Sequence, residues 1–262
     1  MNNLRASLWT ETLKMLRSKV PLFTSIGFLI LPLVGGLFMI ILKDPEAAKS
    51  MGLISTKAQI TVGTADWSAF FNMLSQGTAI GGAILFSIVT TWIFGREFSD
   101  HTVKELLALP TSREATVTAK FIVIAVWTLI LTVAMFLVGL IVGALVDIPG
   151  WSGELLGSSI VNILGSTLLN MILMPYVALL ASTGRGYIPP FGWTILMVAL
   201  AQIAIVTGWG DWFPWAVPAL FVGAVGPREE LLGAHGYVVI LIASVLGFAM
   251  TYYWWRTADQ TR

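Results

Sequence analysis

The sequence predicts an all-α membrane protein, folded as a single transmembrane domain over residues 1–262, with six transmembrane helices. Of its residues, 56% are hydrophobic and only 11% are charged, whereas about 25% of an average soluble domain is charged. Six apolar runs are long enough to cross a hydrocarbon core of about 30 Å at about 1.5 Å per residue. These two observations indicate an integral membrane protein.

The predicted spans hold almost no charge, and Lys120, at a boundary, is the one exception. With an inner amino terminus, 11 of the 15 basic residues fall in cytoplasmic segments, as the positive-inside bias requires. We therefore expect a multi-pass protein of the plasma membrane with both termini in the cytoplasm. The first run exceeds the roughly 7–15 apolar residues of a signal-peptide core, so we expect it to be retained. The predicted spans are 20–42, 74–95, 120–146, 155–181, 188–207 and 236–255.

Residues 3–19 precede the first span and have the pattern of an amphipathic helix. Leu8 and Met15 lie on an apolar arc, whereas Ser7, Glu11 and Lys14 lie on the opposite, polar arc. This pattern predicts an interfacial helix along the inner leaflet. The alternative is a disordered basic tail.

Residues 208–235, between spans five and six, are too apolar for an open loop, but their apolar run is too short to cross the membrane. Pro214 and Pro218 interrupt the segment, so it predicts short re-entrant or interfacial helices on the outer side. The alternative is a seventh span broken by proline, which would place the carboxy terminus outside.

A charged insert separates spans two and three. Thr102 and Glu105 have the spacing of a capping box, and Pro110 ends the helix that they start. A second box, Thr111 and Glu114, predicts the start of the next helix. The pattern therefore indicates a short rigid helix held beneath the membrane.

The same insert resembles a family signature. Gly95-Arg-Glu, followed by Thr102-Val-Lys-Glu-Leu-Leu-Ala-Leu-Pro-Thr-Ser-Arg113 and later Lys120, is similar to the segment between spans two and three of type-2 ATP-binding-cassette (ABC) exporter permeases. The likeness is greatest to bacitracin-resistance and lantibiotic-immunity permeases.

This resemblance implies a coupling helix at 97–110 that docks on a separate ATP-binding cassette ATPase subunit. ATP and Mg would bind to that partner, and this chain would bind no cofactor directly. It also implies a second permease, as a homodimer or a paralogous heterodimer, surrounded by membrane lipids. The implied ATPase-coupling residues are Arg96, Glu97, Asp100, Thr102, Lys104, Glu105, Leu106, Leu107, Pro110 and Arg113.

The sequence lacks the residues by which the chain itself could supply energy for transport. The chain has no Gly-x4-Gly-Lys-Ser/Thr phosphate loop, so it is not expected to be an ATPase. No span carries the Asp, Glu or His of a proton relay. We expect a permease subunit of an ATP-driven exporter for an amphipathic substrate such as a peptide antibiotic. The alternative is a membrane sensor or binding protein that does not pump.

Polar side chains recur at helical spacing in span four, with one more in span five. They could line a translocation path, or they could only form interhelical hydrogen bonds of about 0.6 kcal/mol each. The candidate path residues are Ser159, Asn162, Ser166, Asn170 and Gln202.

Two further patterns have competing interpretations. The pairs Gly77/Gly81 and Gly139/Gly143 permit close helix approach, either within one subunit or between two. Glu230 with His235 suggests an intramembrane metalloprotease, but the His-Glu-x-x-His pattern is missing, so we expect no metal site. The low net charge of +1 argues against nucleic acid as a partner, because phosphate binding needs clustered Lys and Arg.

Overall fold

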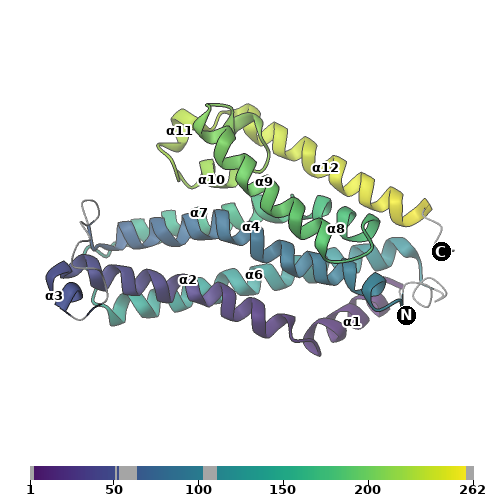
Figure 1. The fold of residues 1–262 in the computed structure, drawn as a ribbon, viewed down its shortest axis with the longest axis horizontal. Helices are drawn as coiled ribbons and strands as arrows, with labels where there is room; N and C mark the ends of the chain where they lie inside the picture. Colours follow the sequence, from purple (N-terminus) through teal and green to yellow (C-terminus); the bar gives the residue numbers. More distant parts are fainter. Residues whose placement is uncertain (1–2, 51, 53–63, 103–110, 258–262) are drawn as a thin grey trace.

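The computed structural model of the protein describes residues 3–50, 52, 64–102 and 111–257. Every regular element in these ranges is a helix, which confirms the all-α prediction. The helices form an elongated bundle, and both chain termini lie at one end of it (Figure 1). We call this the terminal end, and the other end, which carries α3 (Pro45–Ser50) and α11 (Arg228–Leu231), the distal end.

Six helical segments are long and apolar enough to cross a membrane, as predicted. Two of them, each 33 residues long, extend about 50 Å at 1.5 Å per residue, so they project beyond a core of about 30 Å. The spans are α2 (Val20–Lys43), α4 (Trp67–Ser99), α6 (Arg113–Leu145), α7 (Gly153–Met171) continued by α8 (Met174–Thr183), α9 (Ile188–Val206) and α12 (Ala234–Thr257).

The fourth span is broken where α7 passes into α8. Pro175 occupies the first turn of α8, a position that tolerates proline because no amide is needed there. The Pro175 carbonyl accepts a hydrogen bond of 2.9 Å from the Thr251 hydroxyl of α12. A side chain of the last span therefore satisfies a backbone carbonyl at the break.

Helix α4 lies at the centre of the molecule (Figure 1) and packs against α2, α6, α7, α8 and α9. Its most apolar stretch is 61% buried, more than that of any other described span. One apolar cluster surrounds Phe70, Phe86 and Met135, and a second, at the terminal end, surrounds Phe94 and Trp255. A displacement of α4 would thus change the packing of most of the other helices.

The segment between α9 and α12 contains short helices, which agrees with the first of the two interpretations of its sequence. These are η1 (Gly210–Trp212), α10 (Val217–Phe221) and α11. Val217 and Leu220 are fully or almost fully buried, and α10 packs on α7. No seventh span lies within the described residues, and the position of these helices relative to the membrane stays a prediction.

The amino-terminal helix α1 (Asn3–Leu16) forms, but its polar arc is divided between two environments. Ser7 and Glu11 are buried against the bundle, whereas Asn3 and Thr10 of the same arc are exposed. Glu11 is buried because it has an ionic partner inside the bundle. The position of this helix at the membrane interface stays a prediction.

The predicted coupling helix begins differently from the expectation as well. Helix α4 continues to Ser99, so Arg96 and Glu97 belong to the end of span two. The cap of α6 is Ser112, whose hydroxyl accepts a 3.2 Å hydrogen bond from the Ala115 amide, and not Thr111. Five predicted coupling residues lie outside the described residues: Lys104, Glu105, Leu106, Leu107 and Pro110.

The glycine pair in α6 serves packing within the chain. A Cβ at Gly143 would lie 2.2 Å from the Trp67 ring, and one at Gly139 would lie 2.7 Å from Leu74. Both neighbours belong to α4. In the other pair, a Cβ at Gly77 would lie 2.4 Å from Leu31, whereas one at Gly81 would have nothing within 4 Å. Of these four glycines, Gly81 is therefore the one that leaves room for an approaching surface.

Candidate functional site

Four charged side chains from three helices meet inside the terminal end of the bundle. Glu11 and Lys14 come from α1, Glu97 from α4 and Lys120 from α6. The side chain of Lys120 is 0% exposed, those of Glu97 and Glu11 only 3% and 5%, and that of Lys14 26%. We call these four residues the charge network.

The network is closed by four ion pairs. The Lys120 ammonium lies 2.7 Å from Glu97 Oε1 and 3.0 Å from Glu11 Oε2. The Lys14 ammonium lies 2.8 Å from Glu11 Oε1 and 3.0 Å from the same oxygen of Glu97. Two cations and two anions therefore neutralise one another, which is the condition for burying charge.

Lys120 is fully satisfied as a donor. Besides the two carboxylates, its ammonium donates to the Ile93 carbonyl at 2.8 Å, so its three N–H groups have three acceptors. Glu97 Oε2 is buried and has no hydrogen-bond partner among the described residues. The removal of any member would leave a buried ion uncompensated, which is costly.

The network lies between the two ends of the charged insert. Glu97 is in the last turn of α4, and its carbonyl accepts a 2.9 Å hydrogen bond from the Thr102 amide, where the described part of this segment ends. The chain returns at the start of α6, where Arg113 donates to the carbonyls of Trp255 and Arg256 at 3.3 Å. Thus α1, α4, α6 and α12 are all linked close to this segment.

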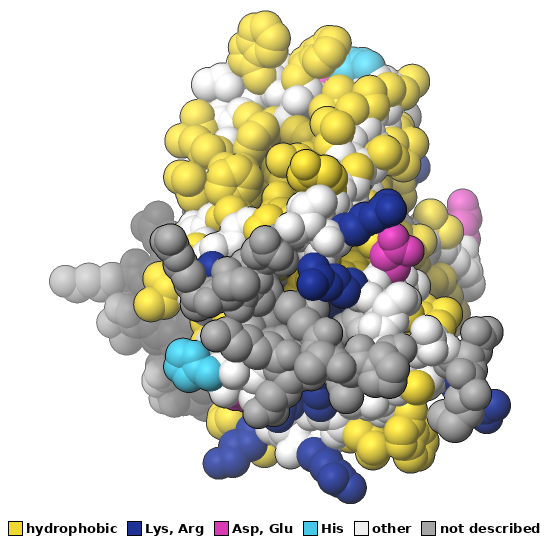
Figure 2. Space-filling model, turned by 90° about the vertical axis from the view of Figure 1, so that its right-hand side faces the viewer, with side chains coloured by type: hydrophobic (Ala, Val, Ile, Leu, Met, Phe, Trp, Pro, Cys, Tyr) yellow, Lys and Arg dark blue, Asp and Glu magenta, His cyan; other side chains and the backbone are white. Residues whose placement is uncertain are grey.

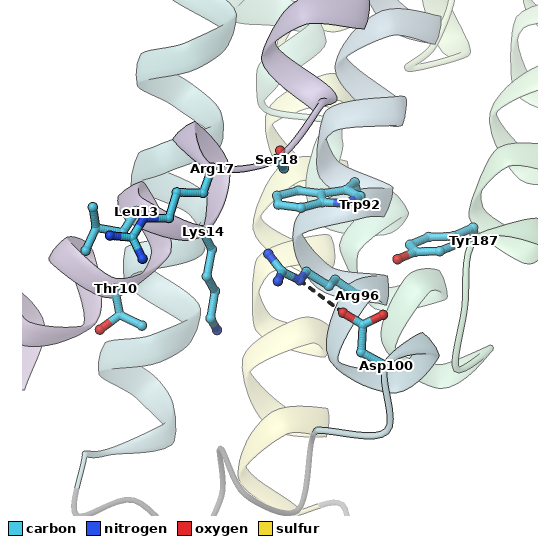
Figure 3. Close-up of a pocket in the computed structure, with 9 residues that line it drawn as sticks. All are labelled: Thr10, Leu13, Lys14, Arg17, Ser18, Trp92, Arg96, Asp100 and Tyr187. Carbon is cyan, nitrogen blue, oxygen red and sulfur yellow. Dashed lines mark hydrogen bonds and ion pairs between the residues drawn. The ribbon is translucent and has the colours of Figure 1, made fainter.

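A cavity of about 560 Å³ opens beside the network, between α1, α4 and the start of α9. Figure 3 shows Arg96 of α4 pointing toward Lys14 of α1, with Asp100, the C-cap of α4, beside it; Arg17, just after α1, lines the same cavity. Arg96 Nε lies 3.1 Å from Asp100 Oδ2, one turn further along the helix. Two of the predicted coupling residues therefore belong to this cavity, and both are partly exposed.

The predicted polar stripe of span four is divided between two environments. Asn170 and Ser166 are buried, and the Asn170 amide donates to the carbonyls of Ala79 and Thr78 in α4 at 3.0 and 3.4 Å. Ser159 is also buried and donates to the carbonyl of Leu155 in its own helix. These hydrogen bonds hold helices together or stay within one helix, as the packing interpretation expects.

Asn162 has a different environment, in a polar cavity of about 400 Å³ at the distal end. Asn72 of α4 and Arg228 of α11 line the same cavity. Gln202 lies apart from the stripe, exposed on α9. The structure therefore does not bring the five candidate path residues together.

His235, at the distal end, contacts an acidic and an aromatic side chain of the same segment. His235 Nε2 lies 2.5 Å from Asp211 Oδ2, and its ring lies 4.6 Å from that of Trp212. Glu230 is exposed nearby in the chain. No group of three His, Cys, Asp or Glu residues that could hold a metal occurs in the part of the chain that the structure describes.

Sequence reasoning did not anticipate the roles of Glu11 and Lys14. The usable signal was Lys120 itself, because a lysine inside an apolar helix requires an anion. Glu97 lay close enough in the predicted topology to be one such anion. Glu11 could not be paired with Lys120 from the sequence, since 109 residues separate them.

The fold and this network define a multi-pass helical membrane protein whose terminal end is held by buried ion pairs. Residues 7–201 match the family model described as "ABC-2 family transporter protein", so the chain belongs to that family. It is similar to the bacitracin transport permease protein BCRB of Bacillus licheniformis, with 26% identity over 182 residues, covering 68% of this chain and 85% of that protein. No solved structure matches.

Proposed function

We propose that this chain is the permease subunit of an ATP-driven exporter. Membership of the ABC-2 family implies an ATPase subunit as a partner. The bacitracin transport permease to which the chain is similar supports an amphipathic substrate such as a peptide antibiotic. ATP and Mg would be held by the partner, and the chain would work with a second permease copy or a paralogue.

In this proposal the terminal end lies in the cytoplasm. Lys and Arg side chains are spread over this face of the molecule, whereas few acidic side chains are visible on it (Figure 2). Such an excess is typical of cytoplasmic segments. The ATPase would then meet the protein at the insert between α4 and α6.

The observation that carries the proposal is the charge network. It joins the last turn of α4 to the second turn of α6, and it also holds α1, directly beside the insert. A force applied to the insert would therefore displace three helices together. Since α4 packs against five other spans or half-spans, this displacement would reach most of the bundle.

The translocation path is proposed to form between two permease halves. Asn162 and Gln202 remain candidates for contact with substrate, because neither side chain has a hydrogen-bond partner within the described chain. Ser159, Ser166 and Asn170 are better suited to packing, since their hydrogen bonds are already made.

The first test is co-purification of the chain from its native membrane in mild detergent, followed by an ATPase assay. We expect an ATPase subunit to travel with the wild-type chain. Glu105→Lys should abolish that association while membrane insertion stays normal, because it reverses a charge in the proposed docking segment. Glu154→Lys is the matched control, since Glu154 is exposed in the first turn of α7 at the distal end.

A chain that purifies without any nucleotide-hydrolysing partner would overturn the exporter proposal. It would favour the alternative, a membrane sensor or binding protein for an amphipathic compound. Equal loss of the partner in both charge-reversed variants would show that the insert has no special part in docking.

A further inference from the structure

The cavity at the terminal end continues into an apolar cleft. The cavity of about 560 Å³ is lined by Lys14, Arg17 and Arg96, and the cleft, of about 380 Å³, by Ile88 and Phe191. The two share Trp92 and Tyr187 as walls. Polar and apolar compartments therefore adjoin, at the level where a span would leave the membrane.

One face of α4 lines both the cavity and the cleft, and the polarity of its side chains decreases from one to the other. Asp100, Arg96, Trp92 and Ile88 follow one another at intervals of four residues, so they lie on one side of the helix. Ile88 and Arg96 are eight positions apart, which corresponds to about 12 Å along the helix axis. Charge thus gives way to an aromatic ring and then to an aliphatic side chain over the depth of a lipid headgroup and glycerol.

The charges of the cavity leave one cation in excess. Lys14 is compensated within the neutral charge network, and Arg96 is paired with Asp100. Arg17 lines the same cavity and forms no ion pair with any residue that the structure describes. The excess matches one negative charge, as in the phosphodiester of an anionic phospholipid.

The aromatic residues have the arrangement that a headgroup boundary favours. The Arg96 guanidinium lies 5.1 Å from the centroid of the Trp92 ring, and the Tyr187 ring faces the same space from the start of α9 (Figure 3). Trp and Tyr settle where apolar tails meet polar headgroups. This boundary coincides with the passage from cavity to cleft.

One polar atom in the apolar cleft is unsatisfied. Thr91 lines the cleft, and its hydroxyl is buried with no hydrogen-bond partner among the described residues. The other buried threonines of α4, Thr78 and Thr90, donate to carbonyls one turn back. Thr91 therefore differs from the other buried threonines of α4 in lacking an acceptor, at the point where the helix borders the cleft.

We propose that this cavity and cleft together bind one anionic phospholipid from the leaflet that surrounds the terminal end. Its phosphate contacts Arg17 and Arg96, and an acyl chain lies along Ile88 and Phe191. Basic pockets between spanning helices are suited to such headgroups. The lipid would rest against α1 and α4, the helices that carry most of the charge network.

The test is native mass spectrometry of the full chain, purified in mild detergent and titrated with phosphatidylglycerol or phosphatidylcholine. We expect one molecule of phosphatidylglycerol to bind in preference to phosphatidylcholine. The variant Arg17→Gln/Arg96→Gln should weaken phosphatidylglycerol binding by roughly fivefold or more per neutralised charge. The variant Ile88→Trp should reduce the binding of the lipid by filling the cleft.

The control is Arg5→Gln, because Arg5 is exposed on α1 and does not line the cavity. This variant should bind phosphatidylglycerol as the wild type does. Competing glycerol phosphate or inorganic phosphate should fail to displace the lipid, since neither has a tail for the cleft.

Equal binding of the two lipids, an equal loss in Arg5→Gln, or displacement by inorganic phosphate would each overturn the lipid site. The measurement needs no ATPase subunit. Its failure would therefore leave the exporter proposal standing, and failure of that proposal would leave the lipid site standing.

Discussion

The two ends of the α4–α6 pair are joined by opposite kinds of contact. At the terminal end, Glu97 and Lys120 meet as buried ions. At the distal end, the Trp67 ring of α4 fills the space above Gly143 of α6 and lies 4.8 Å from the Trp151 ring. The contact between α4 and α6 is ionic at the terminal end, whereas at the distal end it depends on the steric fit of a Trp ring against a Gly.

This difference indicates which end is suited to movement. Ion pairs have discrete arrangements that can exchange partners, and Lys14 already shares its two carboxylates with Lys120. A close-packed aromatic contact offers no such choice of partner. We therefore expect conformational change to be concentrated at the terminal end, with the distal contact as a pivot. The following four substitutions test the comparison, from the largest expected effect to the smallest.

Replacing Lys120 by Met should have the largest effect on stability. It leaves Glu11 and Glu97 buried with only Lys14 to compensate them, and breaking a buried ion pair costs about 3–5 kcal/mol. Thermal unfolding in detergent should show a large loss. Adding Glu11→Gln and Glu97→Gln should restore most of it, because no buried anion then remains. Wild-type stability in the single variant would contradict the ionic account of this end.

Gly143→Ala should destabilise the distal end by steric conflict. The added Cβ would lie 2.2 Å from the Trp67 ring, and overpacking of this kind costs about 1–3 kcal/mol. Gly81→Ala is the control, because nothing lies within 4 Å of its added methyl group and alanine favours a helix by about 0.5–1 kcal/mol. Equal unfolding temperatures for the two variants would show that shape does not limit this contact.

Asp66 tests charge at the distal end, where it caps α4. Its carboxylate accepts from the Thr64 hydroxyl and from the Ala69 amide, and these hydrogen bonds hold the pKa of Asp66 below its usual range. Asp66→Ala should cost about 1 kcal/mol, as for other helix caps.

The pH dependence of the Asp66 contribution has a definite sign. The part that depends on ionisation is fully present above the unfolded pKa of about 3.9 and is lost as pH falls through the lower folded pKa. The stability difference between wild type and Asp66→Ala should therefore shrink below about pH 4. A difference that grows on acidification would contradict this assignment.

Asn170→Leu should have the smallest effect, between the two ends. It removes hydrogen bonds to the carbonyls of Thr78 and Ala79, and interhelical hydrogen bonds in membranes average about 0.6 kcal/mol. Asn162→Leu is the comparison, since Asn162 faces the distal cavity. If the two changes were to alter transport but not unfolding, Asn170 would belong to the path after all.

The number of membrane-spanning helices could be predicted from the sequence, because a span is recognised by the length of its apolar run and by its low charge. It also predicted that a helix precedes the first span and that short helices precede the last. It did not predict that Ser7 and Glu11 of the polar arc of α1 are buried against the bundle. Amphipathic periodicity distinguishes two faces, but it does not say which of them meets the protein when the partner is itself charged.

The candidate site was predictable only in part for a similar reason. Glu97 and Arg96 were identified from a motif, yet their environments differ: Glu97 is buried in the charge network and Arg96 lines an open cavity. Adjacent positions on a helix point about 100° apart. Which of them is buried depends on α1, whose docking cannot be read from local spacing.

The charge network also has a consequence for how the protein is made. Glu11 and Lys120 are 109 residues apart, so at about 5–20 residues per second the ribosome adds the cation roughly 5–20 seconds after the anion. Until then the only cation of the network available to Glu11 is Lys14 of its own helix. Helix α1 is therefore made well before the lysine that completes its buried ion pairs, and we expect its docking to follow the synthesis of the third span.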